Sequence, residues 1–166
     1  IPAIPPVNPD PSTYRLSSSF GYRSDPFTGR SKRHTGVDFA LKPGNPIYAT
    51  GDGIVTNVKF ELFGYGNQVV IDHGFGYKTR YAHMKTIGVV EGMKVKRGEC
   101  IGLSGNSGRS SGPHLHYEVI YKDRHVNPAN YYDLTITPEE YATMVQNTAD
   151  ASQKITLHPS HRKRRK

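Results

Sequence analysis

The chain has 166 residues, of which 35% are hydrophobic, and its formal net charge is +8. This length suits one domain with appendages, and no apolar run approaches the roughly 18 residues that a membrane-spanning helix needs. The single cysteine, Cys100, excludes an internal disulfide, and the 17 glycines, 12 prolines and 11 tyrosines favour turns and strands over a helical bundle.

The first segment, residues 1–16, is predicted to be a proline-rich linker. IPAIPPVNPDPST carries five prolines, which favour extended backbone over a strand or a helix. The stretch that follows, up to Arg33, is rich in glycine, serine and arginine and is predicted to be a long loop. Because the chain begins with Ile1 and shows no signal-peptide pattern, we expect a longer precursor, with a membrane anchor or an inhibitory segment upstream.

Short β-branched and aromatic runs separated by glycine-containing turns occupy the middle of the chain. These runs are PIYATGDGIVTNVKF, NQVVIDHG, YKTRYAHM and HLHYEVIY. Their spacing predicts a mainly β fold, a compact antiparallel sandwich or barrel-like domain over residues 17–135. Residues 42–55 and 91–105 resemble each other, and we interpret them as two hairpin-like units that close the same domain.

One short C-terminal helix is predicted within residues 136–152. Thr137 serves as its N-cap, Pro138 occupies the first helical position, and Glu140 completes a capping box. Residues 153–166 are predicted to be a disordered basic tail that ends in RKRRK; contact with an anionic polymer is the alternative.

Two pairs of polar residues suggest a metal site. In GPHLHYEV, His114 and His116 are two residues apart and therefore share one face of a strand, roughly 7 Å from each other. In RHTGVDFA, His34 and Asp38 lie in a poor helix sequence, so both reach one ion only if the chain bends at Gly36. Two imidazoles and one carboxylate, with a fourth position left for water, form the ligand set of a catalytic zinc. The residues alone leave open which histidine of the first pair binds it.

Three further histidines are interpreted as structural or exposed. His73 is predicted to be a turn histidine with local hydrogen bonds, and His125 is predicted to lie exposed in a turn. The sequence RYAHM predicts that His83 lies in a strand, with Tyr81, His83 and Lys85 on one face.

Three segments, HTGVDFA, GNQVVIDHGFGYKTRYAHM and GNSGRSSGPHLHYEV, resemble in this order the motifs of the lysostaphin-type (LytM-like) zinc endopeptidases, which cut peptidoglycan peptides. The resemblance covers about residues 17–132. It implies an antiparallel sandwich with an open groove and one zinc ion per chain. The implied zinc ligands are His34, Asp38 and His116. It also implies that His83 and His114 flank the bound water and the scissile carbonyl.

The resemblance extends to substrate contacts. Asn67, in YGNQVV, matches a position near the groove, with a turn-capping role as the alternative. Ser111 lies in the loop GNSGRSSG, which we expect to form one groove wall. Arg23, in FGYRSDPF, meets a substrate carboxylate or is a solvated loop arginine.

These observations predict a zinc metalloendopeptidase that cuts peptidoglycan stems or crosslinks. The segment FGYRSDPF resembles a subgroup of Gram-negative family members, and this resemblance favours a D,D-crosslink over a glycine bridge. The expected location is outside the cytoplasm, in the periplasm or cell envelope.

Three alternatives come from other classes. A family member that has lost zinc ligands and activates cell-wall amidases is disfavoured because the histidine and aspartate positions are all filled. A nucleic-acid partner is not expected, since no recognition helix or aromatic-basic motif is present. A cysteine hydrolase is disfavoured because GECIGLSG predicts Cys100 to be a buried strand residue with no base nearby in sequence.

Overall fold

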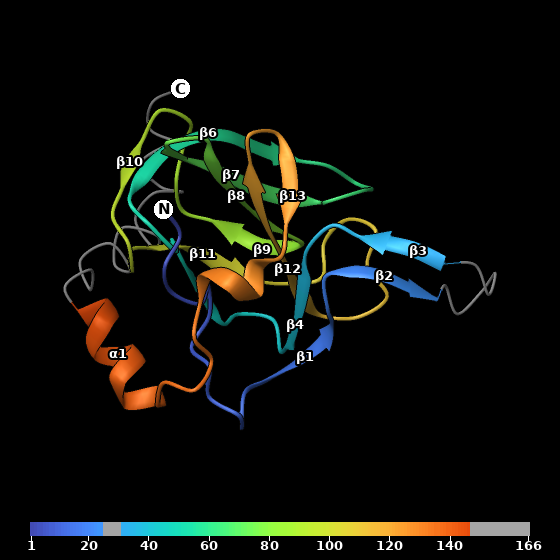
Figure 1. Ribbon diagram of the computed structural model, residues 1–166, viewed down its shortest axis with the longest axis horizontal. Coiled ribbons are helices and arrows are strands. Elements are labelled where there is room, and N and C mark those ends of the chain that lie inside the picture. Colours follow the sequence, from blue (N-terminus) through green and yellow to red (C-terminus); the bar gives the residue numbers. More distant parts are fainter. Residues whose placement is uncertain (25–30, 147–166) are drawn as a thin grey trace.

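An antiparallel sheet of eight strands forms the body of the molecule (Figure 1). The computed structural model describes residues 1–24 and 31–146. The order of the strands is β1–β4–β12–β8–β7–β6–β10, and β13 pairs with β12. Their bounds are β1 Tyr14–Ser18, β4 Val37–Leu41, β6 Gly53–Phe60, β7 Asn67–Gly74, β8 Tyr77–Ala82, β10 Lys94–Val95, β12 His114–Tyr121 and β13 Arg124–Val126.

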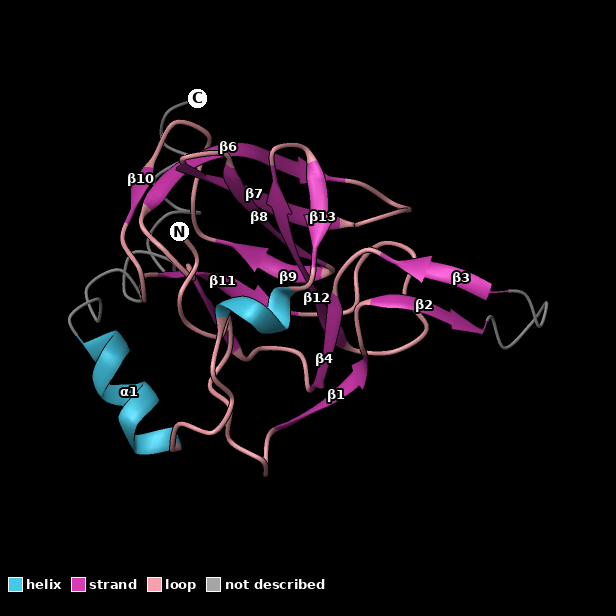
Figure 2. Ribbon diagram, viewed as in Figure 1, coloured by secondary structure: helices cyan, strands magenta, loops and turns pink. Residues whose placement is uncertain are grey.

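A smaller sheet contributes to the same core. It has the order β5–β11–β9, with bounds Pro46–Tyr48, Cys100–Ser104 and Met84–Ile87. Buried side chains of both sheets, among them Phe39, Ile47, Tyr81 and Ile101, form one hydrophobic cluster. The predicted antiparallel β fold is therefore confirmed (Figure 2). The two segments that resemble each other pair strand with strand, β10 with β6 and β11 with β5, as expected of units that close one domain.

The alternation of side chains along β12 positions the polar residues. Leu115, Tyr117 and Val119 are fully buried in the core. Because successive side chains of a strand point to opposite faces, His114 and His116 lie on the other face of the sheet. The antiparallel register of β12 with β4 sets His116 opposite Asp38.

The prediction of a long loop up to Arg33 is wrong for part of that segment. A two-stranded hairpin, β2 (Gly21–Ser24) with β3 (Ser31–His34), projects from the sandwich (Figure 1), while residues 25–30 lie outside the described part. The hairpin sequence shows no alternation of apolar and polar residues. It is held by pairing between its two strands, which the sequence pattern does not reveal.

The prediction of a linker over residues 1–16 needs correction. The first residues contain no strand or helix, as expected, but Ile4 and Val7 are buried, and the amide of Ala3 donates to the carbonyl of Thr50 at 2.8 Å. Strand β1 then begins at Tyr14, inside the predicted linker. Prolines exclude regular structure here, but they do not prevent apolar side chains from packing on the domain.

The C-terminal helix α1 spans Pro138–Gln146, and a 3₁₀ turn, η1 (Pro128–Tyr131), precedes it. The predicted capping box is present: the amide of Glu140 donates to Thr137 Oγ1 at 3.0 Å, and the amide of Thr137 donates to Glu140 Oε1 at 2.9 Å. The rest of the predicted helix and the basic tail lie outside the described residues. No helix in the described part is long and apolar enough to cross a membrane.

Candidate metal centre

His34, Asp38 and His116 come together at one point of the large sheet. Their candidate ligand atoms all lie within 4.8 Å of one another. His116 Nδ1 lies 2.8 Å from Asp38 Oδ1, and His34 Nε2 lies 3.4 Å from Asp38 Oδ2. Two ligands bonded to one zinc at about 2.0–2.2 Å lie at most about 4.4 Å apart, and both pairs are within this limit. Two imidazoles and a carboxylate also match the donors that zinc prefers.

The chain bends at Gly36 between β3 and β4, as the metal-site hypothesis requires. A Cβ atom at this position would lie 2.3 Å from the carbonyl oxygen of Tyr117. Glycine therefore lets the segment pass close to β12, and this approach brings His34 to the same site as Asp38.

His83 and His114 flank the three candidate ligands. Their rings lie 4.7 Å apart, and His114 Nε2 lies 3.8 Å from Asp38 Oδ1. The predicted strand position of His83 is wrong, because this residue lies between β8 and β9 with φ of 60°. Its amide donates to the carbonyl of Tyr65 at 2.8 Å. Left-handed backbone is uncommon outside glycine, and here it turns His83 toward the other histidines while Tyr81 stays in the core.

Backbone carbonyls fix the orientation of three of these histidines. His34 Nδ1 lies 2.8 Å from the carbonyl oxygen of Ser19, His83 Nδ1 lies 2.7 Å from that of Ser107, and His114 Nδ1 lies 2.8 Å from that of Gly112. A carbonyl oxygen only accepts, so Nδ1 carries the proton in each neutral ring. The Nε2 atom of each is therefore left for a metal or a substrate.

The charges of the site follow from burial and contact. Burial raises the pKa of the Asp38 carboxyl, but hydrogen bonds from His116 and His34 outweigh it and hold the pKa well below its ordinary value. Burial lowers the pKa of His116, but the Asp38 and Glu118 carboxylates outweigh it and raise the pKa to about 9. Burial lowers the pKa of His83 to about 4, which keeps its ring neutral at pH 7.

The predicted substrate residues lie around this centre in different ways. Asn67 begins β7, and its side-chain amide donates to the carbonyl of Met84 at 3.0 Å, next to His83. Ser111 is exposed, whereas Ser110 Oγ approaches His114 Nδ1 at 3.1 Å. Arg23 belongs to β2, but its side chain lies outside the described part of the structure.

Two other histidines make contacts of their own. His73 forms hydrogen bonds to the carbonyl of Asp52 at 2.8 Å and to Thr79 Oγ1 at 2.7 Å. It is therefore structural, as predicted, but it lies in β7 rather than in a turn, and Asp52 is not a local partner. The prediction that His125 is exposed is wrong: it is half-buried, with Nε2 2.9 Å from Glu118 Oε1. Its partner Glu118 is fully buried on β12, and the sequence of the turn around His125 gives no sign of this contact. Cys100 is buried in β11, as predicted.

Glu118 is the residue of this site that sequence analysis missed. It follows His114 and His116 at the same two-residue spacing on β12, and its side chain is fully buried. Its Oε2 lies 2.8 Å from His116 Nε2. The spacing of His114, His116 and Glu118 was the signal that could have identified it.

Comparison with known proteins assigns a family to this arrangement. Residues 32–128 match the sequence profile of Peptidase family M23, and the chain belongs to this family. The matched range contains every ligand candidate and both flanking histidines.

Individual relatives agree with the assignment. Peptidoglycan DD-endopeptidase ShyA of Vibrio cholerae is 50% identical over 120 residues, which are 72% of this chain and 28% of ShyA. A zinc-containing peptidase from the same species has a crystal structure with a TM-score of 0.68 and 44% identity, covering 75% of this chain and 39% of that one. The catalytic domain of lysostaphin from Staphylococcus simulans has a TM-score of 0.64 and 28% identity, covering 71% and 91%. The chain thus spans less than a third of the length of ShyA.

Proposed function

We propose that this chain is a zinc metalloendopeptidase that hydrolyses peptide bonds of peptidoglycan. The observation that carries the proposal is the convergence of His34, Asp38 and His116, with the His83 and His114 rings beside them. A zinc ion held by the first three supplies a Lewis acid that polarises a carbonyl and lowers the pKa of water. The structural neighbour from Vibrio cholerae is a zinc-containing peptidase, which supports this choice of metal.

The two flanking histidines supply proton transfer. Nε2 of His83 is unprotonated at neutral pH because burial lowers the pKa of the ring to about 4, so it can accept a proton from the attacking water. Nε2 of His114 faces the candidate ligands, 3.8 Å from Asp38 Oδ1, because Nδ1 is bound to the carbonyl of Gly112. One imidazole accepts the proton, and an imidazolium can donate one to the leaving nitrogen or stabilise the oxyanion. The geometry is compatible with either division of these roles.

The known relatives, rather than the geometry of the site, support a substrate class. ShyA is a peptidoglycan DD-endopeptidase, and its identity of 50% exceeds the 28% of lysostaphin. We therefore favour a D,D-crosslink over a glycine bridge as the bond that is cut. Because peptidoglycan lies outside the cytoplasmic membrane, we place the protein in the periplasm or cell envelope.

The test joins metal content to cleavage. Zinc per chain is measured on purified protein, and intact sacculi are digested and the released fragments analysed by mass spectrometry. We expect about one zinc per chain and new peptide termini, both lost in His116→Ala and both kept in Glu139→Ala, an exposed residue of α1. Absence of zinc in metal-replete wild-type protein would overturn the site and favour the amidase-activating class, whose members have lost zinc ligands. Zinc without cleavage of any peptidoglycan would indicate an inhibitory segment or a missing partner.

A further inference from the structure

Glu118 is a fully buried carboxylate on the strand that carries two site histidines. A carboxylate in such a position is costly unless hydrogen-bond donors surround it. Glu118 lies beside the candidate metal ligand His116 and forms an ion pair with the guanidinium of Arg80.

Five side chains approach the two oxygens of Glu118. Oε2 accepts from Thr35 Oγ1 and from the Tyr65 hydroxyl, each at 2.7 Å, and lies 2.8 Å from His116 Nε2. Oε1 accepts from an Arg80 terminal nitrogen at 2.7 Å and lies 2.9 Å from His125 Nε2. About four lone-pair sites are available on a carboxylate, so both oxygens are saturated.

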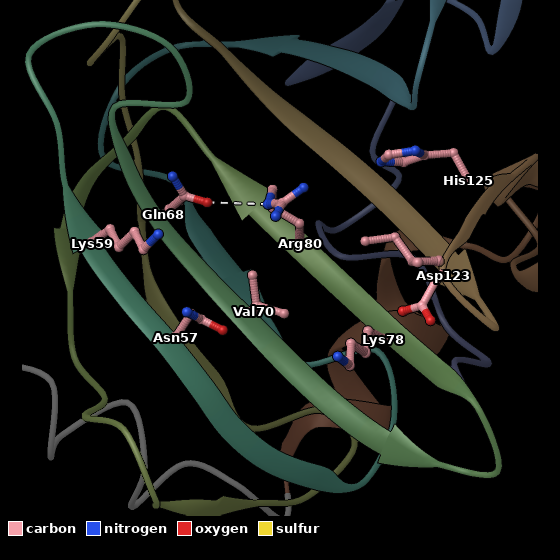
Figure 3. A pocket seen from close by; sticks show the side chains of 9 residues that line it. Asn57, Lys59, Gln68, Val70, Lys78, Arg80, Asp123 and His125 are labelled. Atoms are coloured by element: carbon pink, nitrogen blue, oxygen red, sulfur yellow. Dashed lines mark hydrogen bonds between the residues drawn. The ribbon is translucent and has the colours of Figure 1, made fainter.

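The donors around Glu118 are themselves held in place. The Arg80 guanidinium lies 4.4 Å from the centre of the Tyr65 ring, and its Nε donates to Gln68 Oε1 at 3.1 Å. Figure 3 shows Arg80, Gln68 and His125 on the same outer face of the sheet, where they line an open pocket with Lys59 and Lys78. This face is rich in positive charge, which suits an anion buried just beneath it.

His116 differs from the other three site histidines in its anchor. His34, His83 and His114 each use a backbone carbonyl, whereas His116 uses the Glu118 carboxylate. A carboxylate accepting from the far nitrogen of a metal-bound imidazole fixes the tautomer and makes the ligand more basic. Serine hydroxyls also approach Nδ1 of His34 and His114, but His116 is the one of the four whose anchor has no main-chain carbonyl behind it.

We propose that Glu118 is a positioning residue of the metal centre, which holds His116 with Nε2 protonated and Nδ1 directed at the metal. This inference rests on the proposed function, because it assumes that the His34–Asp38–His116 set binds zinc. Thr35, Tyr65, Arg80 and His125 fix the carboxylate in turn. The effect belongs to metal affinity and not only to folding.

Zinc affinity of Glu118→Gln tests the proposal. A glutamine replaces one acceptor oxygen with an amide group that cannot accept from the surrounding donors. We expect the zinc dissociation constant, measured by competition with a chromogenic chelator, to rise by roughly 10–100-fold. Glu139→Gln, at an exposed carboxylate, should leave it unchanged. A variant that is less heat-stable without metal but binds zinc as tightly as wild type would show a purely structural role and overturn the proposal.

A second measurement needs no variant and covers the case in which Glu118→Gln does not fold. In ¹⁵N-labelled wild-type protein loaded with zinc, imidazole NMR correlations should show the proton of His116 on Nε2 and the metal on Nδ1. Metal on Nε2 would overturn the proposal. If wild-type protein binds no zinc, the proposed function fails. If wild-type protein binds zinc and cleaves but these two results are negative, only the role of Glu118 fails.

Discussion

The chemistry of this site depends on which imidazole nitrogen each histidine presents. For His34, His83 and His114, a main-chain carbonyl holds the Nδ1 proton, so Nε2 of the neutral ring carries no proton and can bind a metal or accept from a substrate. Ser18 Oγ and Ser110 Oγ also approach Nδ1 of His34 and of His114, at 3.3 and 3.1 Å, but the main-chain anchors remain when these side chains are replaced. His83 depends on a left-handed residue conformation as well, with φ of 60°.

The separation of ligands from proton-transfer groups predicts a division of mutant behaviour. His83→Ala and His114→Ala should keep about one zinc per chain but slow cleavage by roughly 10²–10⁴-fold, the usual contribution of general acid–base catalysis. His34→Ala should lose zinc and cleavage together. Zinc content and the rate of fragment release from sacculi measure the two effects. Loss of zinc in either of the first two variants would mean that the altered residue is a ligand.

The sequence predicts the ligand residues better than the residues that support them. The spacing of His114 and His116 defines one strand face, and Gly36 permits the bend that brings in His34. The neighbours of Glu118 come from segments as far away as Thr35, 83 positions earlier in the chain. The two-residue spacing places Glu118 on the same strand face as His114 and His116, but no local pattern records its contacts, so only the fold shows that it anchors His116.

At the scale of elements, the sequence predicts structure that depends on local contacts better than structure that depends on contacts between distant segments. Helix α1 begins where its capping box places it, because Thr137 and Glu140 are three residues apart and bond directly. The turn at His83 depends instead on a contact with another loop, the hydrogen bond from its amide to the carbonyl of Tyr65. The close approach of two loops is another long-range contact of this kind, because a Cβ on Gly66 would lie 2.5 Å from the amide nitrogen of Gly108.

The capping box gives a stability prediction for α1. Thr137→Ala removes the acceptor of the Glu140 amide and should lower the free energy of unfolding by about 1 kcal/mol, with a range of roughly 0.5–2. Thr143→Ala is the matched control, an exposed threonine of the same helix whose effect should stay within about 0.5 kcal/mol. Urea unfolding of the two variants checks this. Equal effects of both substitutions would contradict a specific capping role.

Over the whole molecule, two sets of hydrogen bonds connect distant parts of the fold. One joins the N-terminal residues to α1, and the other is a series of buried polar side chains. The hydroxyl of Tyr141 in α1 donates to the carbonyl of Pro5 at 2.6 Å, so the first residues and the helix close on each other. In the core, Thr50 Oγ1 lies 3.0 Å from the Tyr81 hydroxyl and 2.8 Å from that of Tyr117. Tyr81 contacts Thr79, which contacts His73, so this polar chain extends from the end of β5 across three strands of the large sheet.

His73, the last residue of this buried hydrogen-bonded series, predicts that the stability of the protein depends on pH. Burial lowers the pKa of His73 below its ordinary value of about 6.5. As pH falls below about 6.5, the unfolded chain binds a proton that the folded protein does not, so the stability contributed by the neutral ring is lost with acidification. We expect His73→Gln to lose less unfolding free energy than wild type between pH 7.5 and 5.5. Chemical denaturation with a chelator present removes the metal contribution; parallel pH profiles would exclude this role.

The antiparallel pairing of β4 with β12 sets His116 opposite Asp38, and the same pairing buries Leu115 and Tyr117. A slip of one residue would turn both histidines of β12 inward and both core side chains out to the solvent. Each exposed side chain would cost about 1.5–3 kcal/mol. A misaligned copy therefore fails as a folded protein before it can fail as a metal site. The packing of the core therefore selects the one register of β12 with β4 that also places His116 opposite Asp38.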